Sequence, residues 1–351
     1  MKIAILNDTH FGARSDSQLF ADYFGKFFKD IFFPYCDENG IDTILHLGDF
    51  LDRRKFVNFN TLKNVRENFI DSLDKQDMQL HCLLGNHDTF YKNTNDLNSL
   101  NEVFSNNSRF HVYEEPIVIE LGGCRFGLVP WINTENKKES VDFINTCDAP
   151  ILCGHFELDG YQVMRGVKHE SWMTDEMLRR FEMVLSGHYH CKQSKNNVHY
   201  LGTQYQITFS DLDDQKGFHV FDTETRELEF VPNPYEMFYV FQWNDKSDEL
   251  TQELCEIDAD YLKDSYVKVF VEAKTKPYLF DRFLDRLYNG GVANITIVDA
   301  TEINFEVDEE VDMKQDTLSL IFETIDDMED IEDKSKLKDL VKQLYMESLS
   351  L

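Results

Sequence analysis

The chain has 351 residues, of which 42% are hydrophobic and 28% charged, and its formal net charge is −30. This composition supplies enough apolar side chains for a packed core and excludes a chain that is disordered throughout. The seven cysteines form no CxxC pair, which argues against a cysteine-rich zinc module and favours a reducing, cytoplasmic location. No apolar run of about 18 residues is present, so we expect no membrane span and no membrane partner.

The negative charge is concentrated towards the end of the chain. Residues 301–351 contain 16 acidic and 5 basic side chains, which gives this stretch a net charge of −11. Taken alone, the charge argues against a protein that coats DNA, because DNA-binding proteins usually present a basic surface.

The first ~235 residues alternate short apolar runs with helical patterns, which predicts a layered α/β (α+β) domain. The expected strands are Lys2–Leu6, Thr43–Leu47, Gln79–Leu84, Arg125–Pro130, Pro150–Cys153 and Met183–Ser186. The expected helices are Gln18–Tyr35, Asn60–Leu73, Asn98–Phe104 and Glu139–Asn145. The domain is expected to end in β-structure over Val198–Phe209, Gly217–Asp222 and Leu228–Val231.

Two prolines, Pro232 and Pro234, predict a domain boundary after residue 234, because they disfavour both helix and internal strand. A smaller β-α-β unit is expected over 235–304, with strands Met237–Trp243, Tyr266–Val271 and Ala293–Val298 and helix Pro277–Tyr288. Residues 305–312 are expected to form an acidic linker. Residues 313–351 show apolar side chains at helical spacing, which predicts two amphipathic helices.

Five polar clusters follow expected strands. They are Asp8-Thr9-His10, Gly48-Asp49 with Asp52-Arg53, Gly85-Asn86-His87-Asp88, Gly154-His155, and Gly187-His188-Tyr189-His190. The carboxyl ends of strands are where α/β sheets build their sites, and Asp, Asn and His are ligands that suit Mn²⁺, Fe²⁺ or Zn²⁺. Each cluster alone is a weak indication, but five of them in this order predict a metal site.

The series D-x-H, GDxxDR, GNHD, GH and GHxH over residues 1–190 resembles the calcineurin-like metallophosphoesterase superfamily. Within it, the series is most similar to the SbcD-type nucleases of double-strand-break repair and recombination, especially those of T-even phages. The resemblance implies a β-sandwich flanked by helices over 1–234, a DNA-capping domain over 235–304, and a helical segment at 313–351 that binds a partner ATPase. The matches after residue 234 rest on order and architecture rather than on motifs.

The resemblance also implies a ligand set for two divalent ions, with Mn²⁺ as the expected metal. The first ion would be held by Asp8, His10, Asp49 and His190, and the second by Asp49, Asn86, His155 and His188, so that Asp49 bridges the two. His87 would not be a ligand but would stabilise the developing charge or protonate the leaving oxygen, with Asp88 orienting it. Asp52 would lie outside the ligand set and would hold in place either a ligand or the backbone of its own loop.

Basic side chains near the motifs are expected to contact DNA phosphates. They are Arg14, Arg53, Arg54 and Lys55 beside the first two motifs, and Arg165 and Lys168 in a later polar loop. Alternatively, the four side chains near the first two motifs form surface salt bridges, and the later pair belongs to a solvated loop.

The resemblance implies a metal-dependent DNA nuclease with 3′→5′ exonuclease and endonuclease activity. It implies a homodimer formed through the nuclease domain and an SMC-like ATPase partner of SbcC type, bound by the C-terminal helices, that gates access to DNA. A phosphomonoesterase or protein phosphatase of the same superfamily is the alternative, although Asp88 stands where Ser/Thr phosphatases carry Glu. A non-catalytic scaffold is a third possibility, which the complete set of ligand residues disfavours.

Overall fold

The computed structural model describes residues 1–164, 166–299 and 338. The chain divides into two compact units, the first being Met1–Tyr235 and the second beginning at Glu236. The expectations for Arg165, for residues 300–304 of the capping domain, for the linker 305–312 and for the helices of 313–351 lie outside the described residues, Lys338 excepted. Within the described part of the chain, no helix has both the length and the apolar character needed to cross a membrane.

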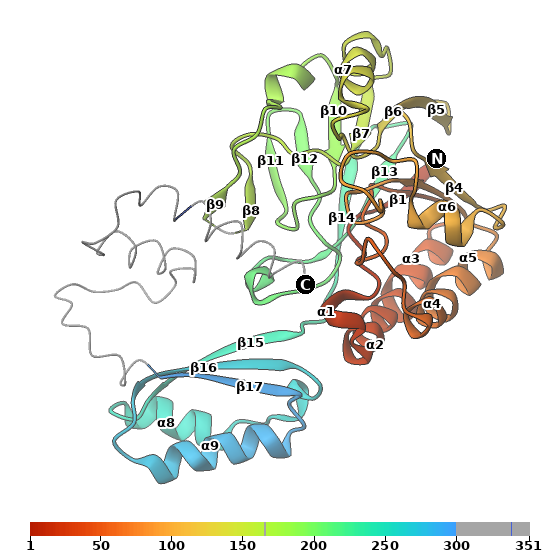
Figure 1. Ribbon diagram of the computed structural model, residues 1–351. Helices are drawn as coiled ribbons and strands as arrows, with labels where there is room; N and C mark the ends of the chain where they lie inside the picture. The colour runs from red at the N-terminus through yellow and green to blue at the C-terminus, as the bar shows by residue number, and fades with distance from the viewer. Residues whose placement is uncertain (165, 300–337, 339–351) are drawn as a thin grey trace. The chain divides into compact units, whose positions relative to one another are not determined.

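The first unit contains two six-stranded sheets (Figure 1). In the order of the first sheet, the strands are β14 (Leu228–Pro232), β13 (Gly217–Asp222), β1 (Lys2–Leu6), β2 (Thr43–His46), β3 (Gln79–Leu83) and β4 (Phe110–Tyr113). In the order of the second sheet, they are β11 (Gln193–Lys195), β12 (Val198–Tyr200), β10 (Met183–Ser186), β7 (Ile151–Gly154), β6 (Cys124–Val129) and β5 (Ile117–Leu121). The strands β1 to β4 are mutually parallel, as are β6, β7, β10 and β12.

One apolar core joins the two sheets. Ile5 and Leu45 of the first sheet belong to the same buried cluster as Leu128, Cys153 and Leu185 of the second. Since each sheet also carries helices, the layered α/β fold with a central β-sandwich is confirmed.

Two helical stretches, each interrupted by a π-helical turn, belong to the first unit. The first runs through α2 (Gln18–Phe27), η1 (Phe28–Phe32) and α3 (Phe33–Glu38), and the second through α4 (Phe59–Val65), η2 (Arg66–Ile70) and α5 (Asp71–Lys75). Phe28 and Phe69 join the two stretches with ring centroids 5.0 Å apart, and Phe32 reaches Phe218 of β13 at 4.9 Å. In Figure 1 these helices lie together beside the first sheet, so the many phenylalanines form the layer that attaches them to it.

The remaining elements of this unit are short. They are α1 (Ala13–Asp16), α6 (Ser99–Phe104), α7 (Lys137–Thr146), the hairpin β8 (Gln162–Met164) and β9 (Val167–Lys168), and the 3₁₀ turns η3 (Asp175–Leu178) and η4 (Phe209–Asp211). The expectation of β-structure across Val198–Phe209 is wrong beyond Tyr200, where β12 ends. The residues that follow form a loop behind the polar clusters, described below.

The second unit is a parallel sheet with helices on one face. Its strands β15 (Phe238–Asn244), β16 (Tyr266–Ala273) and β17 (Asn294–Asp299) lie in that order. The helices are α8 (Asp248–Glu256), the short η5 (Asp260–Leu262) and α9 (Pro277–Asn289). Trp243, Val269 and Phe283 are fully buried in the core between the sheet and the helices. Sequence patterns predicted the three strands and α9 but not α8.

Candidate metal centre

The five polar clusters converge because they follow β1, β2 and β3 of one sheet and β7 and β10 of the other. Three groups of side chains place one ligand atom each within 4.8 Å of one another. These groups are Asp8, His10 and His190; Asp49, His155 and His188; and His10, Asp49 and His87. The structure therefore brings together side chains that are as far apart in the sequence as Asp8 and His190.

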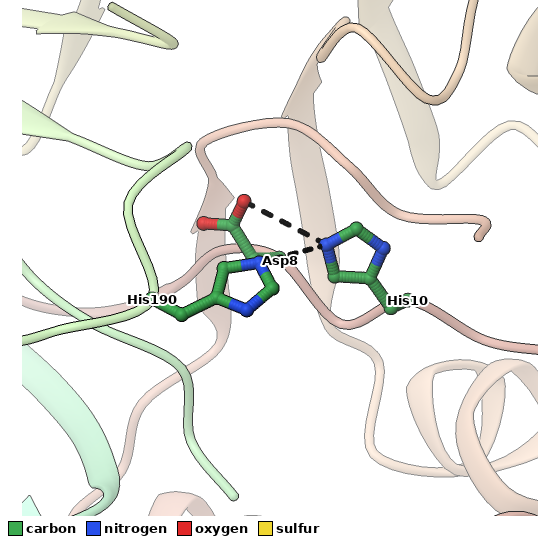
Figure 2. Close-up of side chains that lie close together, drawn as sticks. All are labelled: Asp8, His10 and His190. Carbon is green, nitrogen blue, oxygen red and sulfur yellow. Dashed lines mark hydrogen bonds and ion pairs between the residues drawn. The ribbon is translucent and has the colours of Figure 1, made fainter. Parts of the chain in front are cut away.

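The first group centres on the imidazole of His10, which faces both Asp8 and His190 in Figure 2. His10 Nε2 lies 3.1 Å from His190 Nε2 and 4.0 Å from an oxygen of Asp8. Two ring nitrogens at this separation require a proton or a cation to hold them together, because their lone pairs repel each other. The burial of His10 and Asp8 makes that requirement stronger.

The second group centres on His155, His188 and the amide of Asn86. Asn86 Oδ1 lies 3.0 Å from His155 Nε2 and 2.9 Å from His188 Nδ1. Asp49 connects the two groups, since its Oδ2 lies 3.3 Å from His155 Nε2 and 3.7 Å from His10 Nε2. Asp49 thus has the position that a bridging ligand needs.

Each of three imidazoles has an acceptor oxygen near the ring nitrogen that faces away from the cluster. His10 Nδ1 lies 3.1 Å from a carboxylate oxygen of Asp52, and His155 Nδ1 lies 2.8 Å from the carbonyl oxygen of Leu47. His188 Nε2 lies 3.3 Å from Glu157 Oε1. Such acceptors fix the tautomer that directs the other ring nitrogen into the site. The carboxylate of Asp52, which was expected to support a ligand or its own loop, lies beside His10, whereas Glu157 belongs to no motif and was missed.

The orienting contact of His87 differs from the expectation. His87 Nδ1 lies 2.5 Å from the backbone carbonyl of Asp52, not beside Asp88. The buried Asp88 carboxylate instead accepts hydrogen bonds from the backbone N–H groups of Phe50, Leu51 and Gly85. Asp52 therefore orients His87, while Asp88 ties together the two loops that carry Asp49 and Asn86.

Four of the candidate ligands have a left-handed backbone conformation. The φ angles are 49° at Asp8, 42° at His10, 55° at Asp49 and 83° at His188. This region costs a non-glycine residue of the order of 1 kcal/mol, and such strain concentrates at functional sites. The strain therefore occurs where four side chains are aimed at a common point.

Glycine at position 85 permits the close approach of two loops. A Cβ atom at Gly85 would lie 2.1 Å from an oxygen of Asp49 and 2.2 Å from its backbone nitrogen. No larger residue fits there without displacing Asp49. The close approach of Asp49 therefore explains the glycine that opens the third cluster.

The charges in the cluster shift its pKa values in opposite directions. Burial alone would lower the pKa of His10, but Asp52, Asp49 and Asp8 outweigh burial and raise it to about 9. His155 likewise has its pKa raised to about 9, since Asp49 and Asp8 overcome the effect of burial.

The remaining shifts follow from the same charges. Burial and the nearby His10 lower the pKa of His190 to about 4. Burial would raise the pKa of Asp49, but His155, His87 and His10 hold it well below its usual value. The pKa values are therefore raised at His10 and His155, where a bound cation would take the place of a proton.

A loop behind the first group was also missed by the sequence patterns. Tyr205 donates a hydrogen bond from its hydroxyl to the carbonyl of Thr9 at 2.6 Å, and Asn7 donates one to the carbonyl of Gly202 at 2.9 Å. Trp131 packs on the other group, with its ring centroid 5.5 Å from that of His188. These contacts join residues distant in sequence, so no local pattern could indicate them.

The expected phosphate-binding side chains have different surroundings. Arg54 is half-buried and donates to Thr89 Oγ1 at 3.2 Å, and its Nε has no hydrogen-bond partner within the described residues. Arg53 pairs with Asp16 at 3.4 Å, whereas Arg14, Lys55 and Lys168 are exposed. Burial lowers the pKa of Arg54, while Asp49 and Asp88 oppose that effect, so this guanidinium lies close to the cluster.

The donor set fits divalent cations. It combines carboxylate and amide oxygens with imidazole nitrogens, which suits Mn²⁺, Fe²⁺ or Zn²⁺ rather than a soft, thiolate-bound metal. The close pair of ring nitrogens of His10 and His190 is an independent indication, since a cation between them removes their repulsion.

Comparisons with known proteins agree with this geometry. Residues 1–192 match the family model described as calcineurin-like phosphoesterase, and this match spans all five clusters. Exonuclease subunit 1 of Enterobacteria phage T4 is 35% identical over 233 residues, which cover 66% of this chain and 68% of that protein. A subunit of the nuclease SbcCD from Staphylococcus epidermidis is 25% identical over 269 residues, with coverage of 66% of this chain and 69% of that protein.

Proposed function

The chain belongs to the calcineurin-like phosphoesterase family, and from this premise we propose that it is the nuclease subunit of a DNA recombination and repair complex. The names of two relatives, an exonuclease subunit and a nuclease subunit, support a nucleic acid as the substrate. The observation that carries the proposal is the position of Asp49 Oδ2, which faces a ring nitrogen of His10 on one side and of His155 on the other.

Two divalent ions are proposed, with Mn²⁺ as the expected metal. Asp8, His10, Asp49 and His190 would hold the first, and Asp49, Asn86, His155 and His188 the second. Bound ions of this kind supply Lewis-acid activation of a phosphodiester and of the water that attacks it. The protein contributes the fixed orientation of the ligands through Asp52, Leu47 and Glu157.

His87 is proposed as the proton donor to the leaving oxygen. Its Nδ1 is engaged by the carbonyl of Asp52, and a ring nitrogen lies within 4.8 Å of the ligand atoms of His10 and Asp49. Burial lowers the pKa of His87, and Asp49 opposes that shift. In its protonated form the imidazolium can donate a proton to the leaving oxygen. Arg54 is proposed to contact a DNA phosphate beside His87.

We further propose an SMC-like ATPase partner and a homodimer. The ATPase would gate DNA access and bind residues 313–351, while 235–304 would cap the DNA. The name of the SbcCD relative, a subunit of a larger nuclease, supports a partner. Large apolar side chains exposed on the first unit support self-association, among them Phe59 at 89% exposure and Phe56 at 56%.

Hydrolysis assays distinguish DNA from smaller substrates. The purified chain is incubated with Mn²⁺ and either linear duplex DNA or a phosphomonoester, beside a His87→Ala variant. We expect release of nucleotides from DNA ends, little phosphomonoester hydrolysis, and a loss of about 10²–10⁴-fold in DNA turnover for the variant with metal binding retained. A preference for the phosphomonoester would identify the chain as a phosphatase, and full DNA turnover by the variant would refute the role of His87.

A further inference from the structure

We propose that Glu157 is a positioning residue for the second metal position, where its carboxylate holds His188 with Nδ1 directed at Asn86 and His155. This inference rests on the proposed function and deepens it. Glu157 Oε1 lies 3.3 Å from His188 Nε2, while His188 Nδ1, on the opposite side of the ring, lies 2.9 Å from Asn86 Oδ1 and 3.2 Å from His155 Nε2.

The backbone on both sides of Glu157 is fixed by one hydroxyl group. Tyr200 donates its hydroxyl hydrogen to the carbonyl of Phe156 at 2.8 Å and accepts the N–H of Leu158 at 3.1 Å. Phe156 is itself buried, and its N–H donates to Ser186 Oγ at 3.0 Å. Because the backbone on both sides of Glu157 is fixed, the position of the Glu157 carboxylate is restricted as well. The carboxylate can therefore orient the ring of His188.

Packing restricts the ring of His188 but cannot choose its tautomer. The ring centroid lies 5.5 Å from that of Trp131 and 4.9 Å from that of Tyr189, so the imidazole is confined between large side chains. Neither neighbour distinguishes a hydrogen on Nδ1 from one on Nε2. An acceptor at Nε2 does, because it favours the tautomer whose Nδ1 lone pair is free to bind a cation.

Glu157 acts from outside the ligand set. None of the three metal-binding groups among the described residues includes it, and its oxygen contacts the nitrogen on the far side of the ring from Asn86. Asp52 has the equivalent place behind His10 in the first group, with 3.1 Å between the carboxylate and Nδ1. Each metal position therefore has its own orienting carboxylate, and the two should be separable by mutation.

Titration of the full-length protein with Mn²⁺ in a calorimeter tests this assignment. The variants are Glu157→Ala, Glu157→Gln, which keeps an acceptor oxygen, and the control Glu170→Ala, which removes an exposed carboxylate from the same region. We expect Glu157→Ala to weaken one of two ions by about 10–100-fold and to leave the other unchanged. Glu157→Gln should restore most of the Mn²⁺ affinity that is lost in Glu157→Ala, and Glu170→Ala should bind Mn²⁺ as the wild type does. Asp52→Asn should weaken the binding of the other ion instead.

A second readout does not depend on counting ions. Nitrogen chemical shifts of His188, recorded with diamagnetic Zn²⁺ bound so that Asn86 Oδ1 does not compete for a hydrogen on Nδ1, should report a hydrogen-bonded Nε2–H in the wild type and a changed Nε2 shift in Glu157→Ala. Equal loss of both ions in Glu157→Ala, or unchanged affinities in a variant that folds normally, would overturn the assignment of Glu157 and leave the proposed nuclease intact. A wild-type protein that binds fewer than two ions would overturn the proposed function and this inference with it.

Discussion

At the residue scale, the candidate site depends on two aspartates that each contact more than one other residue. Asp49 faces His10 and His155 through one oxygen and accepts the backbone N–H of His87 at 2.7 Å through the other. Asp52 holds His10 through its carboxylate and His87 through its carbonyl. A substitution at Asp49 therefore affects several side chains at once, whereas one at Asp52 removes the contact with His10 and keeps the backbone contact with His87.

The same residues predict how the stability of the metal-free protein depends on pH. His10 and His155 have pKa values of about 9 in the folded protein, above the ordinary value of 6.5. The folded state then binds more protons than the unfolded state between these values, so its stability falls as pH rises. We expect the free energy of unfolding, measured by urea titration without metal, to decrease from pH 7 to pH 9.

Addition of Mn²⁺ should reverse this trend, because both rings must lose their protons before they can bind a cation. Stabilisation by the metal should therefore grow over the same interval. A metal-free protein whose stability rises from pH 7 to pH 9 would contradict the protonation of the two rings.

At the residue scale, the sequence motifs located the candidate ligand residues that the structure brings together, but not the residues that contact them from outside the cluster. Asp8, Asn86 and His190 stand in short patterns whose chemistry is visible locally. Glu157, Leu47 and Trp131 contact the site only through tertiary structure, so their roles could not be predicted. Asp88 accepts backbone N–H groups and does not face His87, because a carboxylate next to a histidine in sequence need not face it in space.

At the element scale, the site is placed by the ends of strands whose apolar patterns were clear. β1 and β10 have the predicted bounds, and β2 and β3 end one residue before the prediction. The errors lie in segments whose conformation depends on other parts of the chain. The residues from Leu201 to Thr208 are apolar enough to suggest a strand, but they bend behind the site because their polar groups bond to the first cluster.

A substitution of Tyr205 tests whether this loop supports the site. Its ring stacks on Phe24 with centroids 3.8 Å apart, and its hydroxyl donates to the buried carbonyl of Thr9. Tyr205→Phe keeps the stack but leaves the carbonyl unsatisfied, which should cost about 1–3 kcal/mol of stability in urea unfolding. It should also weaken the Mn²⁺ ion bound beside His10, whereas Tyr91→Phe at an exposed position should change neither quantity. Wild-type stability of Tyr205→Phe would show that the loop does not support the site.

At the scale of the whole molecule, the net charge of −30 limits how the chain can meet DNA. Two divalent ions beside Asp8 and Asp49 would leave the centre with a formal charge of about +2, and bound-ion charge governs phosphate attraction locally. The acidic residues elsewhere still repel the backbone of DNA. We therefore expect much of the affinity for DNA to come from the proposed partner ATPase.

DNA binding by the isolated chain should accordingly be weak and sensitive to salt. If Arg14, Arg53, Arg54 and Lys55 each neutralise one phosphate, a fourfold rise in salt should lower the affinity by about 100-fold. Arg54→Gln should reduce the slope of log affinity against log salt by about 0.9, and Lys29→Gln on an exposed helical turn should not. Fluorescence anisotropy with a labelled duplex measures the affinity and its dependence on salt. Nanomolar binding by the isolated chain at physiological salt would contradict the expectation that the partner supplies most of the affinity.

The most direct test of the shared metal centre is the number and affinity of Mn²⁺ ions bound by Asp49→Asn. The substitution preserves shape but removes the charge that faces His10 and His155. Calorimetry should show both ions weakened together, while Asp37→Asn at an exposed helical position should bind two ions as the wild type does. If one ion kept its wild-type affinity in a folded Asp49→Asn protein, Asp49 would not bridge the two positions.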